Sequence, residues 1–173
     1  MKSRLEILES DFQPAHITVL YEDLATALRA NALLECPFYC NQFTEDSKTE
    51  FWRFDLLKDA SQRRAAVRMA ERSRLVVVSA LSQNSIQPAV ESCVSAWLEA
   101  RAHQPGALAV LFSDPNGVSR YGRTTVSSWW QKANEQRMRF YCDLPEWQSD
   151  FLFGARSLAA KAADQPKLAA YLN

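Results

Sequence analysis

The chain has 173 residues, of which 47% are hydrophobic and 23% charged, and its 20 basic and 20 acidic residues cancel to a net charge of zero. This composition is typical of a globular domain that is large enough to bury a core. A net charge of zero argues against nucleic acid or an anionic membrane surface as a partner of the whole chain. The charges are unevenly divided: residues 1–50 hold four Lys/Arg and nine Asp/Glu, and residues 53–74 hold seven and three, which can orient a partner.

The cysteines and the lengths of the apolar runs indicate the cellular environment that we expect for the chain. Metal sites need ligands at recognisable spacings, and no such spacing is formed by the two histidines or by Cys36, Cys40, Cys93 and Cys142. We therefore expect reduced, mostly buried thiols. No apolar run approaches the roughly 18 residues of a membrane span, and the first ten residues lack the apolar core of a secretion signal. We expect one cytoplasmic domain over 1–173, with a lead-in at 1–14 and a tail at 164–173.

Strand and helix patterns alternate along the first half of the chain. Aliphatic and aromatic runs predict strands, and apolar residues at helical spacing predict helices, so we expect strands at 17–21 and 51–57 and helices at 24–34 and 60–72. Asp23 and Asp59 stand directly before the two helical patterns, where a side-chain oxygen accepts from unpaired backbone N–H groups. Pro37 ends the first helix.

The second half continues the same alternation. The run Leu75–Val78 is apolar without alternation, which suits a strand buried on both faces of a parallel sheet. Pro88 suits the first turn of a helix. The remaining patterns predict strands at 107–112 and 140–144 and helices at 88–98, 123–133 and 151–162.

This order of elements predicts the fold class. Parallel strands need helical crossovers, so alternating strands and helices indicate an α/β protein with helices on both faces of one sheet. We predict a three-layer, doubly wound, five-stranded parallel sheet of the flavodoxin-like kind, with strand order 2-1-3-4-5.

In such a sheet, ligands bind outside the carboxyl ends of the strands, near the point where the strand order reverses. The candidate crevice residues at those ends are Glu22, Asp23, Ser79, Ser82, Ser113 and Asp114. Glu22 and Asp23 are also the candidates for holding a cation, with Mg²⁺ the one ion considered and no other cofactor expected. The alternative interpretation of this pair is a helix cap that interacts favourably with the helix dipole.

Residues 15–163 resemble the receiver domain of response regulators in layout. The matching features are five βα units, the acidic pair Glu22-Asp23 after the first strand, and Ser113 where the family has a Ser/Thr. The resemblance implies a Mg²⁺ site at the acidic pair and an aspartate that accepts a phosphoryl group. The third strand, however, ends in Ser79-Ala80-Leu81 without a carboxylate, and the fifth ends in Asp143-Leu144-Pro145 without the lysine. An acyl phosphate cannot form without its nucleophile, so the resemblance implies a degenerate receiver.

Glu91 offers an enzymatic alternative. It lies one turn into the helix predicted at 88–98, a placement similar to the catalytic glutamate of TIR-like and nucleoside deoxyribosyltransferase-like domains, which act at a ribosyl carbon. The glycine-bearing first loop of those domains is absent, and an exposed helical glutamate is the plainer interpretation. We assign no catalytic residue.

Aromatic residues crowd the C-terminal third and include the candidate interface residues Tyr121, Trp129, Trp130 and Trp147. Adjacent helical residues point about 100° apart, so we expect one tryptophan of the pair near the surface and Trp130 against the sheet. Tyrosine and tryptophan are enriched at interface hot spots, although a bulky core under the last helix is the alternative. We expect an interaction module that forms a homo-oligomer or binds a protein partner. The alternatives are a small-ligand or nucleotide site or an enzyme in the crevice, and nucleic-acid binding through the helical arginines.

Overall fold

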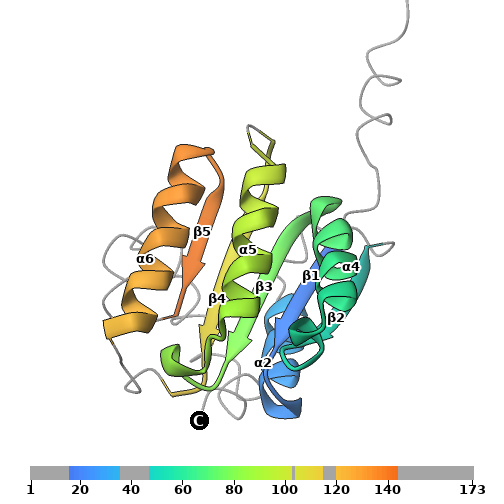
Figure 1. Cartoon of the computed structure of the whole chain (residues 1–173), viewed down its shortest axis with the longest axis vertical. Coiled ribbons are helices and arrows are strands. Elements are labelled where there is room, and N and C mark those ends of the chain that lie inside the picture. Colours follow the sequence, from blue (N-terminus) through green and yellow to red (C-terminus); the bar gives the residue numbers. More distant parts are fainter. Residues whose placement is uncertain (1–15, 36–46, 103, 115–119, 144–173) are drawn as a thin grey trace, which may run out of the picture.

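The computed structural model of the chain describes residues 16–35, 47–102, 104–114 and 120–143, with the backbone alone at 120–123 (Figure 1). The predicted helix at 151–162, the tail and Trp147 lie outside the described residues. Five strands pair in parallel in the order β2-β1-β3-β4-β5, which confirms the predicted topology. The strands are β1 (His16–Tyr21), β2 (Lys48–Arg53), β3 (Ser73–Ala80), β4 (Ala107–Phe112) and β5 (Arg139–Cys142).

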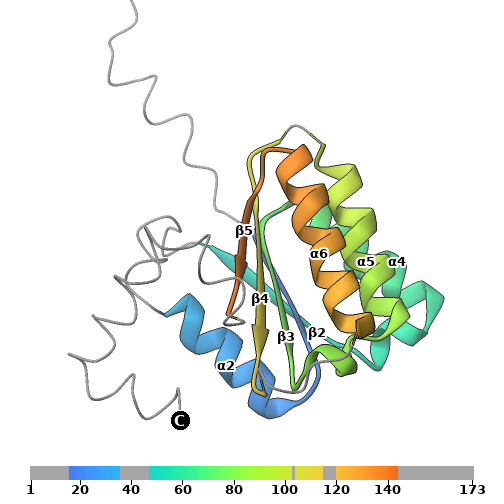
Figure 2. The ribbon, with the colours of Figure 1, turned by 90° about the vertical axis from the view of Figure 1, so that its left-hand side faces the viewer.

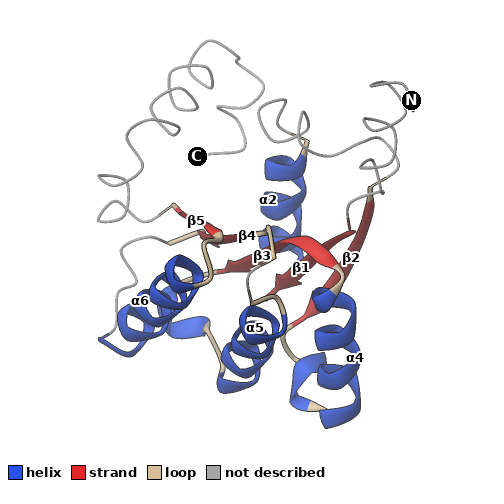
Figure 3. Cartoon of the chain, turned by 90° about the horizontal axis from the view of Figure 1, so that it is seen from above, coloured by secondary structure: helices blue, strands red, loops and turns tan. Residues whose placement is uncertain are grey.

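Helices lie on both faces of the sheet. Figures 2 and 3 show α2 on one face and α4, α5 and α6 side by side on the other. The bounds are α2 (Leu24–Leu34), α4 (Ala60–Glu71), α5 (Pro88–Ala100) and α6 (Arg120–Glu135), with 3₁₀ turns η1 (Leu56–Lys58) and η2 (Gln83–Ser85). No helix among the described residues has the length and apolar run needed to cross a membrane.

The sheet separates two hydrophobic clusters. Successive strand residues point to opposite faces, so Leu75 and Val77 of β3 pack on the α2 side with Ala30, while Val76 and Val78 pack on the other side. The larger cluster lies under α4, α5 and α6 and contains the fully buried side chains of Phe54, Trp97 and Trp129. The burial of β3 on both faces is what its unbroken apolar run predicts.

The second strand differs from its prediction at 51–57. It covers Lys48–Arg53, and the chain then turns into η1. Phe54 and Leu57 are both buried, and a spacing of three places two side chains on one side of a 3₁₀ turn but on opposite faces of a strand. The last pairing bond at this end runs from the Phe54 N–H to the Tyr21 carbonyl, 2.8 Å apart.

The tryptophan pair of α6 also corrects its prediction. Trp129 shares the buried face with Val126 and Ala133, three and four residues away, and all three are fully buried. Trp130 is 37% exposed, so the expectation that it packs against the sheet is wrong. α6 begins at Arg120, one turn before the predicted 123, and β5 covers Arg139–Cys142 instead of 140–144.

Truncation of the two tryptophans should therefore have unequal effects. We expect Trp129→Ala to lower the free energy of unfolding by about 3–5 kcal/mol, because it empties a large buried volume. Trp130→Ala, its matched control, should lower it by about 1 kcal/mol. Urea denaturation measures both values, and equal losses would contradict the placement of α6.

Candidate functional site

The loops after β1, β3 and β4 meet at the carboxyl edge of the sheet, and Leu81 joins them. Its N–H donates to the Glu22 carboxylate at 2.8 Å, and its carbonyl accepts from the Asp114 N–H at 2.6 Å. The Glu22 N–H donates to the Ser79 carbonyl at 3.2 Å, and the Ser113 N–H donates to the Ala80 carbonyl at 3.1 Å. The structure thus brings the predicted crevice residues of three strands to one edge.

Asp23 is committed to the start of α2. Its carboxylate accepts from the Thr26 N–H at 2.9 Å, and the Thr26 hydroxyl accepts from the Asp23 N–H at 2.9 Å, which completes a capping box. With Glu22 bonded to Leu81, both members of the acidic pair satisfy backbone donors. No group of three His, Cys, Asp or Glu side chains within the described ranges is placed to hold a metal ion, so a cation here would rest on this pair alone.

The serines of the predicted crevice differ in exposure. Ser79 is fully buried near the end of β3, and its hydroxyl has no hydrogen-bond partner among the described residues. Ser82 is half-buried with its hydroxyl oxygen 3.4 Å from that of Ser85, and Ser113 is exposed beside Asp114. β3 ends at Ala80 and is followed by Leu81, so this strand end carries no carboxylate.

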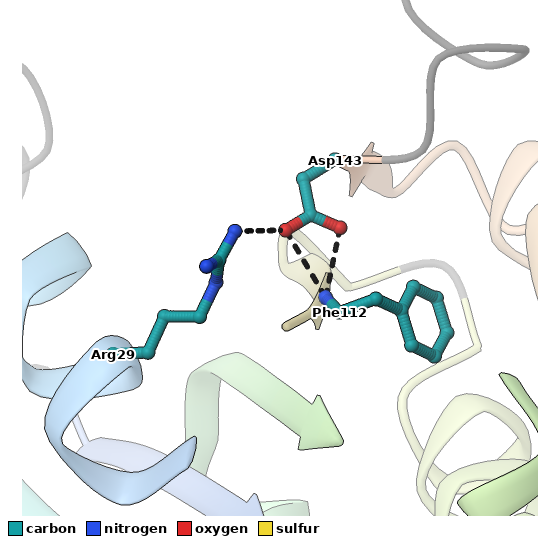
Figure 4. A network of polar contacts seen from close by, with 3 residues as sticks. All are labelled: Arg29, Phe112 and Asp143. Carbon is teal, nitrogen blue, oxygen red and sulfur yellow. Dashed lines mark hydrogen bonds and ion pairs between the residues drawn. The ribbon is translucent and has the colours of Figure 1, made fainter. Parts of the chain in front are cut away.

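Asp143, directly after β5, forms a polar network that the sequence patterns did not reveal (Figure 4). Its two carboxylate oxygens accept from the Phe112 N–H at 2.9 and 3.0 Å, and one of them accepts from Arg29 of α2 at 2.9 Å. The Asp143 N–H donates to the Val110 carbonyl of β4. The Phe112 N–H, the next donor of β4 on this side, binds the Asp143 carboxylate in place of a backbone carbonyl. One carboxylate therefore ties α2, β4 and β5 together.

Burial governs the charge of this network. The side chains of Arg29 and Asp143 are only 26% and 23% exposed. Burial raises the pKa of the Asp143 carboxyl because the charged form loses hydration, and the Arg29 guanidinium and the Phe112 N–H oppose that rise. The acidic group at the end of β5 thus has a structural role.

A groove of about 570 Å³ opens between the start of α2 and the end of β2. It is lined by Tyr21, Glu22, Asp23, Leu24, Ala27, Arg53 and Asp55. Arg53 donates to both Asp55 oxygens at 2.6 and 2.7 Å, which lowers the pKa of Asp55 and raises that of Arg53. The Tyr21 ring meets Phe51 edge-on at 6.2 Å between centroids, which fixes one wall. Of this lining, the candidate crevice set included only Glu22 and Asp23.

The other candidates lie away from the groove. Glu91 is half-buried in the first turn of α5, where a carboxylate interacts favourably with the helix dipole. Among the interface candidates, Trp129 belongs to the core and Trp130 is partly exposed. The side chain of Tyr121 and all of Trp147 lie outside the described residues. Within the described part of the chain, the predicted aromatic surface is reduced to Trp130.

Removal of the cap at Asp23 should destabilise the fold without any ligand. We expect Asp23→Ala to lower the free energy of unfolding by about 0.5–2 kcal/mol, because the first turn of α2 loses an acceptor. Asp23→Ser keeps an acceptor and should retain most of the stability. Urea denaturation in buffer without divalent ions measures both, and equal losses for the two variants would contradict the capping role.

Asp143 should contribute a specific pH dependence to stability. Because its pKa in the folded state lies above the unfolded value of about 3.9, the folded protein binds this proton more tightly. The stabilisation from this carboxyl is therefore fully present below the unfolded pKa and is lost as the pH rises through the folded pKa. The free energy of unfolding of the natural protein, less that of Asp143→Asn, should fall over the pH range above the unfolded pKa of about 3.9. Urea denaturation across that range measures it, and a difference that rises with pH would show that Arg29 outweighs burial.

No protein-family model matches the chain, and no match is found among curated proteins. The likeness to receiver domains therefore stays a prediction, based on layout and on the residues at the strand ends.

Proposed function

We propose that this chain is a receiver-like interaction module that acts by self-association and not by phosphoryl transfer. The roles of the acidic residues at the carboxyl edge support the second half of this proposal. Glu22 and Asp23 accept backbone N–H groups, Asp143 binds Phe112 and Arg29, and the end of β3 offers Ser79 in place of a carboxylate. Glu22, Asp23 and Asp143 thus each have a structural partner.

The observation that carries the proposal is an exposed apolar face on α2. Leu24 is 74% exposed and Leu28, one turn along the same face, is 59% exposed. Phe51 of the edge strand β2 is 42% exposed. Large aliphatic side chains exposed next to each other are typical of surfaces that another protein covers.

A second copy of the chain is the partner that the charges favour. The net charge is zero, yet residues 1–50 carry an excess of five acidic groups and residues 53–74 an excess of four basic ones. Segments of opposite net charge favour contact between two copies of one chain. α2 with its acidic start belongs to the first segment, and the arginine-rich α4 belongs to the second.

The groove favours one alternative function, the binding of a small ligand. Its volume of about 570 Å³ is within the range of ligand sites, and it lies where parallel sheets bind ligands. Three carboxylates and one guanidinium line it, which favours a cationic ligand over a phosphate. Thermal unfolding against Mg²⁺, amines, nucleotides and flavins tests this alternative, since a ligand at about 100 times its Kd adds roughly 2.7 kcal/mol of stability.

Self-association should appear as a mass that depends on concentration. We expect sedimentation velocity over roughly 1–100 μM to show reversible growth beyond the monomer, the behaviour of a modest interface. Leu24→Ser combined with Leu28→Ser should weaken this growth, because it removes apolar area from the contact. Trp130→Ala changes the remaining residue of the predicted aromatic surface, on α6, and should leave this growth unchanged. Loss of association in this variant, with the leucine variant unaffected, would contradict the assignment of the contact to α2. A monomer at every concentration would contradict the proposal.

A further inference from the structure

The groove beside α2 has the chemistry that recognises a guanidinium group. Glu22 and Asp55 supply carboxylate oxygens, and Tyr21 supplies an aromatic ring in the same lining. Guanidinium groups form charge-assisted hydrogen bonds with carboxylates and stack on aromatic rings. Asp55 already accepts from one guanidinium in this way, that of Arg53, and its side chain stays 48% exposed.

A row of guanidinium groups lies on another surface of the same chain. Arg64, Arg68 and Arg72 follow one another at intervals of four along α4 and its C-cap, and all three are exposed. None of them forms an ion pair or a side-chain hydrogen bond with a described residue, and the charge of Arg64 acts only at longer range on Asp59, whose pKa it helps to lower. Like charges at this spacing repel one another and destabilise a helix. An anionic surface that covers this arginine row would relieve the repulsion.

We propose that the arginine row of one copy docks in the groove beside α2 of a second copy. This inference rests on the proposed self-association and names its two surfaces. The groove and the row are different surfaces on opposite faces of the sheet, since α2 and α4 lie on opposite sides (Figure 3). The contact is therefore heterologous, so each added copy leaves one groove and one row open, and the assembly grows head to tail.

A second copy suits the row better than a nucleic acid does. A nucleic acid would match the arginine row but would leave the acidic groove without a partner, and the zero net charge gives no long-range attraction to a polyanion. A second copy satisfies both surfaces at once. It also places the exposed Leu24, which lines the groove, inside the contact.

Two neutralising variants test the assignment. Glu22→Gln with Asp55→Asn removes two charges from the groove and keeps amide oxygens that accept hydrogen bonds. Arg64→Gln with Arg68→Gln removes two charges from the row and keeps helix-forming side chains. Each variant alone should self-associate about tenfold more weakly than the natural protein in sedimentation velocity, because each loses two charge pairs. Mixed one to one, they should form a complex of two chains and no larger species, since only one intact row meets one intact groove.

The controls separate this inference from the proposed function. Glu35→Gln with Glu135→Gln, and Lys132→Gln with Arg139→Gln, make the same charge changes elsewhere and should leave association unchanged. A natural protein that is monomeric at every concentration overturns the proposed function and this inference together. If both variants self-associate as strongly as the natural protein does, only this inference is overturned. If the arginine variant loses binding to duplex DNA and keeps its self-association, the arginine row binds a polyanion and the inference is overturned as well.

Discussion

Burial of β3 on both faces is the constraint from which the rest of the structure follows. Residues 75–78 are at most 2% exposed, and their side chains point alternately to the two faces of the sheet. Each face therefore needs a helical layer, α2 on one side and α4, α5 and α6 on the other. Parallel crossovers through those helices bring the carboxyl ends of all five strands to one edge. The position of the candidate site is thus a consequence of one apolar run.

At that edge, backbone N–H groups bind the acidic side chains that a metal or catalytic site would also need. Strands and helices leave N–H groups without partners where they end, and such groups are costly when water is excluded. Glu22, Asp23 and Asp143 accept them, from Leu81, Thr26 and Phe112 respectively. A carboxylate held in this way keeps lone pairs for a side chain that docks from outside, but it cannot move to converge with its neighbours on one metal ion. This accounts for an edge rich in acidic residues among whose described members no metal-binding group is assembled.

Local patterns predicted the fold well and the site only in part. The cap at Asp23 depends on spacings within a few residues, whereas the strand order is predicted from the number and alternation of the elements. The structure has both. The pairing of Arg29 with Asp143 joins residues 114 apart, and no local pattern encodes such a contact. The pattern of residues 51–57 fits one continuous strand and also fits a strand followed by a turn. The packing of Phe54 in the core decides between the two. Adjacent tryptophans are similarly ambiguous until the position of α6 on the sheet is known.

Helix stability accounts for the acidic groups at the carboxyl edge of the sheet. Every helix here runs antiparallel to the strands, so the helix N-termini lie at the carboxyl edge and the C-termini at the opposite edge. Helix dipoles favour acidic groups at the N-terminus, where Asp23, Asp59 and Glu91 lie, and basic groups in the last turn, where Arg68 and Lys132 lie. Since the dipoles are aligned, this rule gathers acidic groups at the carboxyl edge. The opposite edge is mixed in charge, because Glu35, Glu71, Glu99 and Glu135 lie at or near the helix C-termini. The proposed head-to-tail contact therefore depends on the acidic groove and on the arginines along α4, with the exposed leucines of α2 beside the groove.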